Sequence, residues 1–215
     1  GFTGTWRERA SRRIAHVLSR FGGVLVFDFR GHGRSSGLST VGDREIHDID
    51  AVVRHARVIG YRRVVTVGFS MGAAVAVRHA GLLGGVDGVV AVSGPARWYY
   101  RGTRPMRQVH WAIEQPVGRL VTRLVKRTRI AVGPWDPIPM PPYEAVRLIA
   151  PTPLLIVHGD ADAFFPVEHA HQLYENARDP RELWIEPGYG HAETAATPAL
   201  IRRIGDWASK AKKIP

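Results

Sequence analysis

One serine stands where its hydroxyl could act as a nucleophile. Ser70 lies in the sequence GFSMG, between Gly68 and Gly72. An apolar, β-branched run precedes this sequence and an alanine-rich stretch follows it, so we expect Ser70 on a sharp corner between a strand and a helix. A side chain at either glycine should collide with neighbouring backbone. The hydroxyl would then lie outside the core, beside a helix N-terminus that can stabilise a developing oxyanion.

Three further polar sequences accompany this corner. They are DFRGHGRSSG at 28–37, HGDADAFFP at 158–166 and GYGHAE at 188–193. Together with the Ser70 sequence, they make nearly the whole chain resemble the α/β-hydrolase family, in its serine esterase, lipase and lysophospholipase branches. The resemblance implies an α/β fold with a mostly parallel central sheet flanked by helices and a small helical cap. It also implies a small-molecule ester substrate and no metal or organic cofactor.

The resemblance assigns two partners to Ser70. A serine hydroxyl is a weak nucleophile, so it needs a base within hydrogen-bond reach and a third group that orients the base. The family order of serine, acid and histidine makes His191 the base and Asp162, the last residue of a GxxD pattern, the acid. Asp160 is the competing acid, although it better suits a turn-stabilising role. The noncatalytic alternatives are a loop-stabilising His191 and a Ser70 that only caps a helix.

An oxyanion needs two backbone donors. The resemblance assigns them to the amides of Met71, which follows the nucleophile, and Phe2, which follows Gly1 of a His-Gly pair whose histidine is expected upstream.

The family strand before this loop is also expected upstream, and in the sheet it would lie between strands at 23–29 and 64–69. We therefore expect this sequence to be part of a longer chain. If it folded alone, those two strands could pair directly and displace Phe2.

Alternating strands and helices must position these residues. Short apolar runs predict parallel strands, and segments of helical period predict the helices that cover both faces of the sheet. Thr197 and Pro198 are typical of the N-cap and first position of the last helix. The expected strands are 23–29, 64–69, 88–94, 153–159 and 182–188, and the expected helices are 11–19, 43–59, 71–80, 167–177 and 198–210.

An insertion interrupts the alternation. We predict a hydrolase core from residues 1–95 and 151–215, with residues 96–150 forming a basic cap and a proline-rich connector. The family often places a lid here, so aromatic residues of the cap are candidates for lining an acyl pocket. These substrate-binding candidates are Trp98, Tyr99, Tyr100 and Trp111.

Most of the net charge of +11 lies in this insertion. Three roles are open for this basic segment: a solvated helical face, a lid over the site, or a surface that binds anionic membranes. Nucleic-acid binding is disfavoured because no recognition motif accompanies the charge. The sequence contains no run of about 18 apolar residues, so it predicts no membrane-spanning helix. Localisation stays open, with a slight preference for the cytoplasm, because a targeting segment could lie upstream. Between residues 96 and 130, Glu114 is the single acid, and the basic residues are Arg97, Arg101, Arg104, Arg107, Arg119, Arg123, Lys126, Arg127 and Arg129.

Composition and spacing disfavour several other chemistries. The 215-residue chain has no cysteine, which excludes disulfides, thiolate nucleophiles and cysteine-based zinc sites. A metal pair of His169 and His171 is disfavoured because these positions diverge on a helix. The glycines after Asp28 fit no nucleotide fingerprint, so Gly31 and Gly33 are expected to support a tight turn.

The predicted function is hydrolysis of a carboxylic ester through an acyl-enzyme on Ser70. A thioesterase, acyltransferase, peptidase or carbon–carbon bond hydrolase could use the same three side chains, and a noncatalytic binding protein could keep the fold. Epoxide and haloalkane hydrolases are disfavoured because their corner carries an aspartate where this chain has Ser70.

Overall fold

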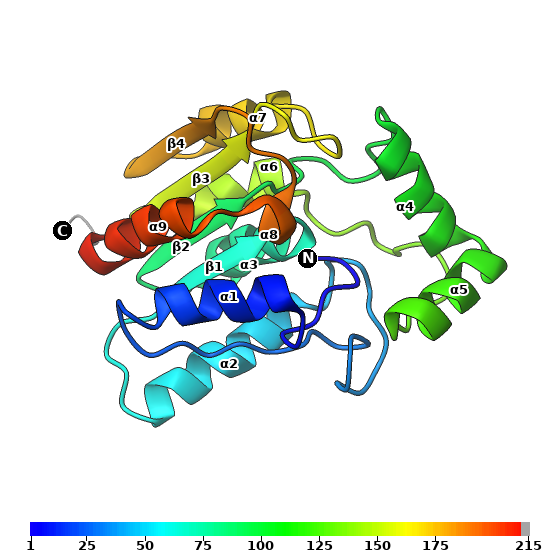
Figure 1. Cartoon of the computed structure of the whole chain (residues 1–215), viewed down its shortest axis with the longest axis horizontal. Coiled ribbons are helices and arrows are strands. Elements are labelled where there is room, and N and C mark those ends of the chain that lie inside the picture. The colour runs from blue at the N-terminus through cyan, green and yellow to red at the C-terminus, as the bar shows by residue number, and fades with distance from the viewer. Residues whose placement is uncertain (212–215) are drawn as a thin grey trace.

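A four-stranded parallel sheet forms the centre of the computed structural model, which describes residues 1–211 (Figure 1). Its strands are β1 (Val65–Phe69), β2 (Gly88–Val92), β3 (Leu154–Gly159) and β4 (Arg181–Glu186), and they neighbour one another in chain order. All three pairings are parallel, so each connection crosses back over a face of the sheet. The carboxyl ends of the strands therefore meet at one edge.

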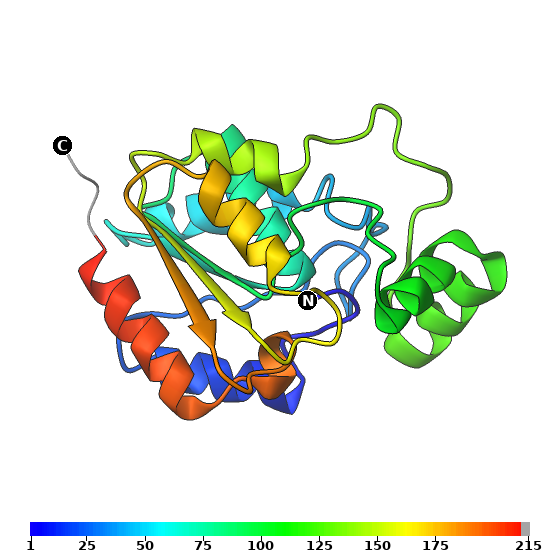
Figure 2. The same ribbon diagram turned by 90° about the horizontal axis from the view of Figure 1, so that it is seen from above.

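Helices cover both faces of this sheet (Figure 2). One face carries α1 (Arg9–Leu18) and α9 (Pro198–Lys210). Thr197 caps α9 as expected, because its side chain accepts a hydrogen bond from the Leu200 amide. The other face carries α2 (Ile46–Val58), α3 (Met71–Leu82), α6 (Pro142–Ala145), the 3-10 helix η1 (Val146–Leu148) and α7 (Glu168–Asn176).

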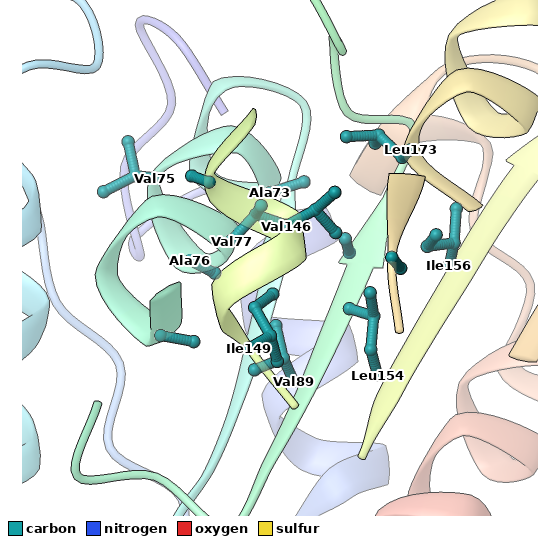
Figure 3. Close-up of a cluster of buried hydrophobic side chains, with 14 of the residues drawn as sticks. Ala73, Val75, Ala76, Val77, Val89, Val146, Ile149, Leu154, Ile156 and Leu173 are labelled. Atoms are coloured by element: carbon teal, nitrogen blue, oxygen red, sulfur yellow. The ribbon is translucent and has the colours of Figure 1, made fainter. Parts of the chain in front are cut away.

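Alternation along the two central strands builds a separate core on each face. Val89 of β2 and Ile156 of β3 pack toward α2, α3 and α7, and Figure 3 shows part of this cluster. Their neighbours Val90 and Val157 point the other way, toward α1 and α9. Because successive side chains of a strand face opposite sides, a strand covered on both sides reads as a continuous apolar run. The α/β class predicted from the sequence is therefore confirmed.

The predicted strand at 23–29 is wrong. This segment is extended coil, and β1 pairs only with β2 among residues 1–211. A strand is stabilised by hydrogen bonds to a neighbouring strand, and none lies beside 23–29 in the described part of the chain. Val24, Leu25 and Val26 are consequently 36–45% exposed, while Phe27 and Phe29 pack on the core. The segment does not pair directly with β1, so the expected displacement of Phe2 by such pairing does not occur.

A pair of helices projects from the core beyond the carboxyl ends of the strands (Figures 1 and 2). It consists of α4 (Arg104–Glu114) and α5 (Pro116–Lys126), and we call residues 98–127, which comprise these helices and the segment leading into them, the cap. The two helices cross closely, because a Cβ atom on Gly118 would lie 2.7 Å from the Cα of Ala112. Farther along the chain, Ala145 and Val146 are fully buried against the core, so the segment after the connector returns to α3.

Candidate active site

Ser70 occupies a strained corner between β1 and α3. Its φ of 53° lies in the left-handed region, which residues other than glycine rarely adopt. Backbone hydrogen bonds hold the corner on both sides. The Ser70 amide donates to the Val92 carbonyl at 2.9 Å, and the Ser70 carbonyl accepts from the Ala73 amide at 2.9 Å.

The two glycines around this corner have different roles. A Cβ atom on Gly68 would lie 2.2 Å from the carbonyl oxygen of Gly72, so only glycine fits at position 68. A Cβ atom on Gly72 would meet only the ring of Phe29, at 3.7 Å, an ordinary contact distance. The expectation that both glycines prevent a collision is therefore right for Gly68 and wrong for Gly72.

The structure brings Ser70, His191 and Asp162 into one hydrogen-bonded row. The distance from His191 Nε2 to Ser70 Oγ is 2.9 Å, and His191 Nδ1 lies 2.8 Å from Asp162 Oδ2 and 3.0 Å from Oδ1. These residues follow β1, β3 and β4, whose carboxyl ends share one edge of the sheet. An ionised carboxylate only accepts hydrogen bonds, so Nδ1 carries the proton and Nε2 is free to accept the Ser70 hydroxyl.

Asp162 is buried and well satisfied. Its side chain is fully shielded from solvent, and Oδ1 also accepts the amides of Phe164 and Phe165, at 2.8 and 3.1 Å. Burial alone raises the pKa of this carboxyl. The hydrogen bond and charge of His191, with the two amides, outweigh burial and leave the pKa below its ordinary value. Asp162 is therefore a carboxylate at neutral pH.

Asp160 serves the neighbouring loop instead. Its Oδ1 accepts the Gly188 amide at 2.6 Å, which joins the loop after β3 to the loop after β4. This contact is the turn-stabilising role expected from the sequence, and Asp162 is the carboxylate that reaches His191.

The loop that carries His191 has supports that sequence reasoning missed. The Ala192 amide donates to the hydroxyl of Ser93 at 3.1 Å, and the hydroxyl of Tyr189 donates to the Ala192 carbonyl at 2.7 Å. Ser93 and Tyr189 are both buried. The ring of Phe164 stacks on His191 with their centroids 4.2 Å apart. One signal was available, because Ser93 is a polar residue directly after a fully apolar strand.

Two backbone donors lie beside Ser70. The amides of Met71 and Phe2 make no hydrogen bond within residues 1–211. Met71 begins α3 directly after Ser70, so its amide belongs to the first turn, where donors have no partner within the helix. Gly1 approaches Ser70 so closely that a Cβ atom on it would lie 3.2 Å from Ser70 Cβ. Phe2 and Met71 both line the cavity described next.

A cavity of about 2050 Å³ separates the core from the cap. Ser70 and His191 lie on its wall, and the cap contributes apolar and aromatic side chains. Trp98 and Tyr99 are among them, as the sequence suggested. The remaining apolar lining from the cap includes Tyr100, Met106, Val109 and Ile113.

Trp111 does not reach this cavity. It is 49% exposed and lies on the face of α4 turned away from the lining residues Val109 and Ile113. Positions four apart share a face of a helix, so Trp111 points outward together with the exposed Arg107. The pocket role suggested for Trp111 therefore finds no support in its position.

Trp135 of the connector lines the cavity and was missed. Its indole N–H donates to the Thr40 carbonyl at 2.7 Å, and its ring lies 5.2 Å from the ring of Trp98. The indole N–H of Trp98 donates to the Pro139 carbonyl at 2.8 Å. These two tryptophans join the connector, the start of the cap and the core loop that contains Thr40, a contact that no local sequence pattern could reveal.

The residues that the sequence analysis considered for metal or nucleotide binding make contacts within the fold instead. Within the described residues, no group of three or more metal-ligating side chains is clustered to hold a metal ion. His169 is fully buried, and its Nδ1 accepts the amide of Ala96, which lies just before the cap. Asp28 accepts the Trp6 amide at 2.8 Å, and Gly31 and Gly33 adopt positive φ in the expected turn.

Comparisons with known proteins agree with this architecture. Residues 1–202 match a family model described as "Alpha/beta hydrolase family". Human Protein ABHD12B is 29% identical over 215 residues, which cover 92% of this chain but only 56% of that protein. Monoacylglycerol lipase of Mycolicibacterium smegmatis is 28% identical over 222 residues, covering 83% of this chain and 76% of the lipase. The crystal structure of Pyrococcus furiosus esterase Pf2001 aligns with a TM-score of 0.75 and 26% identity, covering 99% of this chain and 81% of the esterase.

Proposed function

Since this chain belongs to the alpha/beta hydrolase family, we propose that it hydrolyses carboxylic esters through an acyl-enzyme formed on Ser70. One observation carries the proposal. A continuous row of hydrogen bonds runs from a buried carboxylate through His191 to the Ser70 hydroxyl, on the wall of a cavity. The names of the P. furiosus esterase and the M. smegmatis monoacylglycerol lipase favour esters among the possible acyl substrates.

Acylation begins when His191 Nε2 removes the proton from Ser70 and Oγ attacks the ester carbonyl. Asp162 stabilises the resulting imidazolium and keeps Nε2 directed at the serine. The negative charge on the tetrahedral oxygen is held by the amides of Met71 and Phe2. His191 then gives its proton to the departing alkoxide, and the acyl group stays on Ser70.

Deacylation repeats these steps with water. His191 removes a proton from a water molecule, which attacks the acyl carbonyl of Ser70. Collapse of the second tetrahedral intermediate returns the proton to Ser70 Oγ and releases the carboxylic acid. No atom beyond those of the protein, the ester and one water is needed to balance the reaction.

The cavity favours an acyl group of considerable size. Its volume of about 2050 Å³ exceeds the roughly 300–1,000 Å³ that is common for small-molecule sites. Trp98, Tyr99 and Met106 are the cap residues that we assign to the acyl chain. We expect kcat/KM to rise as the acyl chain lengthens, because each added methylene removes more apolar surface from water.

A panel of carboxylic esters, thioesters and anilides of matched acyl length tests the proposal. We expect the esters to be hydrolysed fastest. Ser70→Ala should lower kcat by about 10⁶-fold, as loss of the nucleophile does in an analogous serine protease. Its melting temperature should not fall, because the strained corner needs no serine side chain. An alanine variant that keeps ester turnover would refute the role of Ser70. Faster hydrolysis of thioesters than of esters would contradict the proposed substrate class.

A further inference from the structure

Helix α5 turns its apolar side toward solvent. Gly118 and Thr122 are the residues of this helix that are buried, against α4 and the cavity. The opposite side carries five aliphatic side chains that are 45–71% exposed. They are Val117, Leu120, Val121, Leu124 and Val125, which we call the α5 stripe.

Helical spacing makes the α5 stripe continuous. Residues at positions i, i+3, i+4, i+7 and i+8 lie on one side of a helix, and the stripe occupies these positions from Val117 to Val125. Isolated exposed apolar side chains are ordinary on protein surfaces, whereas a contiguous patch marks a surface that contacts a partner or a membrane. The basic residues Arg119 and Lys126 lie on the other side and line the cavity.

The cap carries many basic residues and, in residues 98–127, the single acid Glu114. Three of the cap arginines are engaged within the cap. Arg107 donates to the Arg101 and Gly102 carbonyls, both at 3.3 Å. Arg119 donates to the Ile113 and Glu114 carbonyls at the end of α4, and Arg101 pairs with Glu114 at 2.5 Å. In the part of the chain that the structure describes, four cap side chains have no hydrogen-bond or ion-pair partner: Arg104, Arg123, Lys126 and Arg127. Of these, Arg123 and Arg127 flank the stripe, because they follow Leu120 and Leu124 by three residues each.

We propose that the α5 stripe docks the cap on the surface of a bilayer that contains anionic phospholipids. The stripe would enter the boundary between headgroups and acyl chains, and the flanking Arg123 and Arg127 would contact lipid phosphates and carboxylates. Apolar contact alone would suit many partners. The two arginines beside the stripe that are unpaired in the described chain, Arg123 and Arg127, select an anionic surface among them.

The helix lies on the bilayer and does not cross it. Eleven residues of α-helix span about 16 Å, whereas the hydrocarbon core is roughly 30 Å thick. Among the described residues, no helix combines the length and the apolarity that a membrane span requires. The cap stands away from the core in both views, so α5 can meet a flat surface before the rest of the molecule does (Figures 1 and 2).

Sedimentation with lipid vesicles tests the proposal without using the chemistry of Ser70. We expect binding to vesicles of phosphatidylcholine with roughly one-third phosphatidylserine, and much weaker binding to phosphatidylcholine alone. High salt should weaken the binding to the anionic vesicles. The Ser70→Ala variant should bind as the native protein does, so a failure of the proposed hydrolysis is distinguishable from a failure of docking.

Substitutions in the stripe and at its flanks separate the two contributions. Leu120→Ser with Leu124→Ser should weaken binding by about a hundredfold, roughly tenfold for each leucine. Arg123→Gln with Arg127→Gln should weaken it by about 25-fold, fivefold for each arginine, and should reduce its dependence on salt. The control is Val58→Ser, at a side chain that is 83% exposed at the end of α2 far from the cap, and it should bind like the native protein.

Three results would overturn the proposal. One is native protein that does not bind the anionic vesicles. Another is a Leu120→Ser, Leu124→Ser variant that melts at the native temperature and still binds them with native affinity. The last is a dimer of the native protein that these serines dissociate while vesicles have no effect, because the stripe would then be a contact between two copies.

Discussion

Two aspartates two residues apart show how one hydrogen bond separates their roles. Asp162 accepts Nδ1–H of His191, whereas Asp160 accepts the Gly188 amide. Both carboxylates belong to one loop, and although the GxxD pattern favours Asp162, Asp160 was a competing candidate for the acid. Their difference comes from the path of the loop and the direction of each side chain. We therefore expect the two positions to respond differently to the same isosteric change.

Asp162→Asn should lower kcat by about 10⁴-fold with little change in fold. An asparagine offers its N–H₂ group to Nδ1, which places the imidazole proton on Nε2 and removes the acceptor for Ser70. Asp160→Asn is the matched control, since its amide oxygen can still accept the Gly188 amide, and kcat should change less than tenfold. Steady-state ester kinetics measure both variants. Equal losses at the two positions would contradict the assignment.

The convergence of Ser70, Asp162 and His191 was predictable from the sequence, while the contacts that support their loops were not. Ser70, Asp162 and His191 lie in short glycine-containing sequences whose local pattern marks turns at strand ends. Ser93 acts through a contact with Ala192, 99 residues away, and no spacing rule connects them. The outward position of Trp111 was also hidden, because the side of α4 that meets the cavity is decided by how the cap packs.

At the scale of elements, the corner after β1 yields a paired prediction. Gly68→Ala would bring Cβ into the Gly72 carbonyl and should lower the free energy of unfolding by about 3 kcal/mol or more. Gly72→Ala meets only the ring of Phe29 and gains about 1 kcal/mol of helix propensity, so it should be neutral or slightly stabilising. Chemical denaturation measures both. A native-like Gly68→Ala variant would show that the corner is looser than its geometry implies.

Elements whose signal is local were predictable, and those that depend on distant partners were not. Strand β2 is buried along its whole length, so its apolar run is a sufficient signal. The equally apolar segment at 23–29 needs a neighbouring strand to become one itself, and the described chain provides none. The cap was expected as a basic helical stretch, but the outward direction of the α5 stripe depends on the α4–α5 crossing at Gly118.

For the whole molecule, buried histidines predict loss of stability in mild acid. Burial lowers the pKa of His169 to about 4, assisted by the nearby charge of Arg97. Burial also lowers the pKa values of His32, His79 and His158. The unfolded chain takes up these protons near pH 6.5, before the folded chain does. The free energy of unfolding should therefore fall as pH decreases from about 6.5 toward 4, by up to about 1.4 kcal/mol per pH unit for each histidine.

Urea unfolding between about pH 7.5 and pH 5 measures this slope. His169→Gln removes one titrating group. The dependence of its free energy of unfolding on pH should therefore be weaker, by up to the uptake of one proton, whatever the stability of the variant at neutral pH. Asp162 contributes to stability in a different, more acidic pH range. Its lowered pKa contributes stability that is complete above about pH 4 and is lost as pH falls through the folded value. Stability that stays constant between about pH 7.5 and 5 would contradict the burial of neutral histidines.

Labelling by a fluorophosphonate, followed by intact-mass measurement and peptide mapping, tests the central claim most directly. Only a serine activated by a neighbouring base reacts rapidly with such a probe. We expect one adduct per chain on Ser70, none in Ser70→Ala, and strongly slowed labelling in Asp162→Asn. An adduct on another residue, or native protein that hydrolyses esters while Ser70 stays unlabelled, would contradict the account.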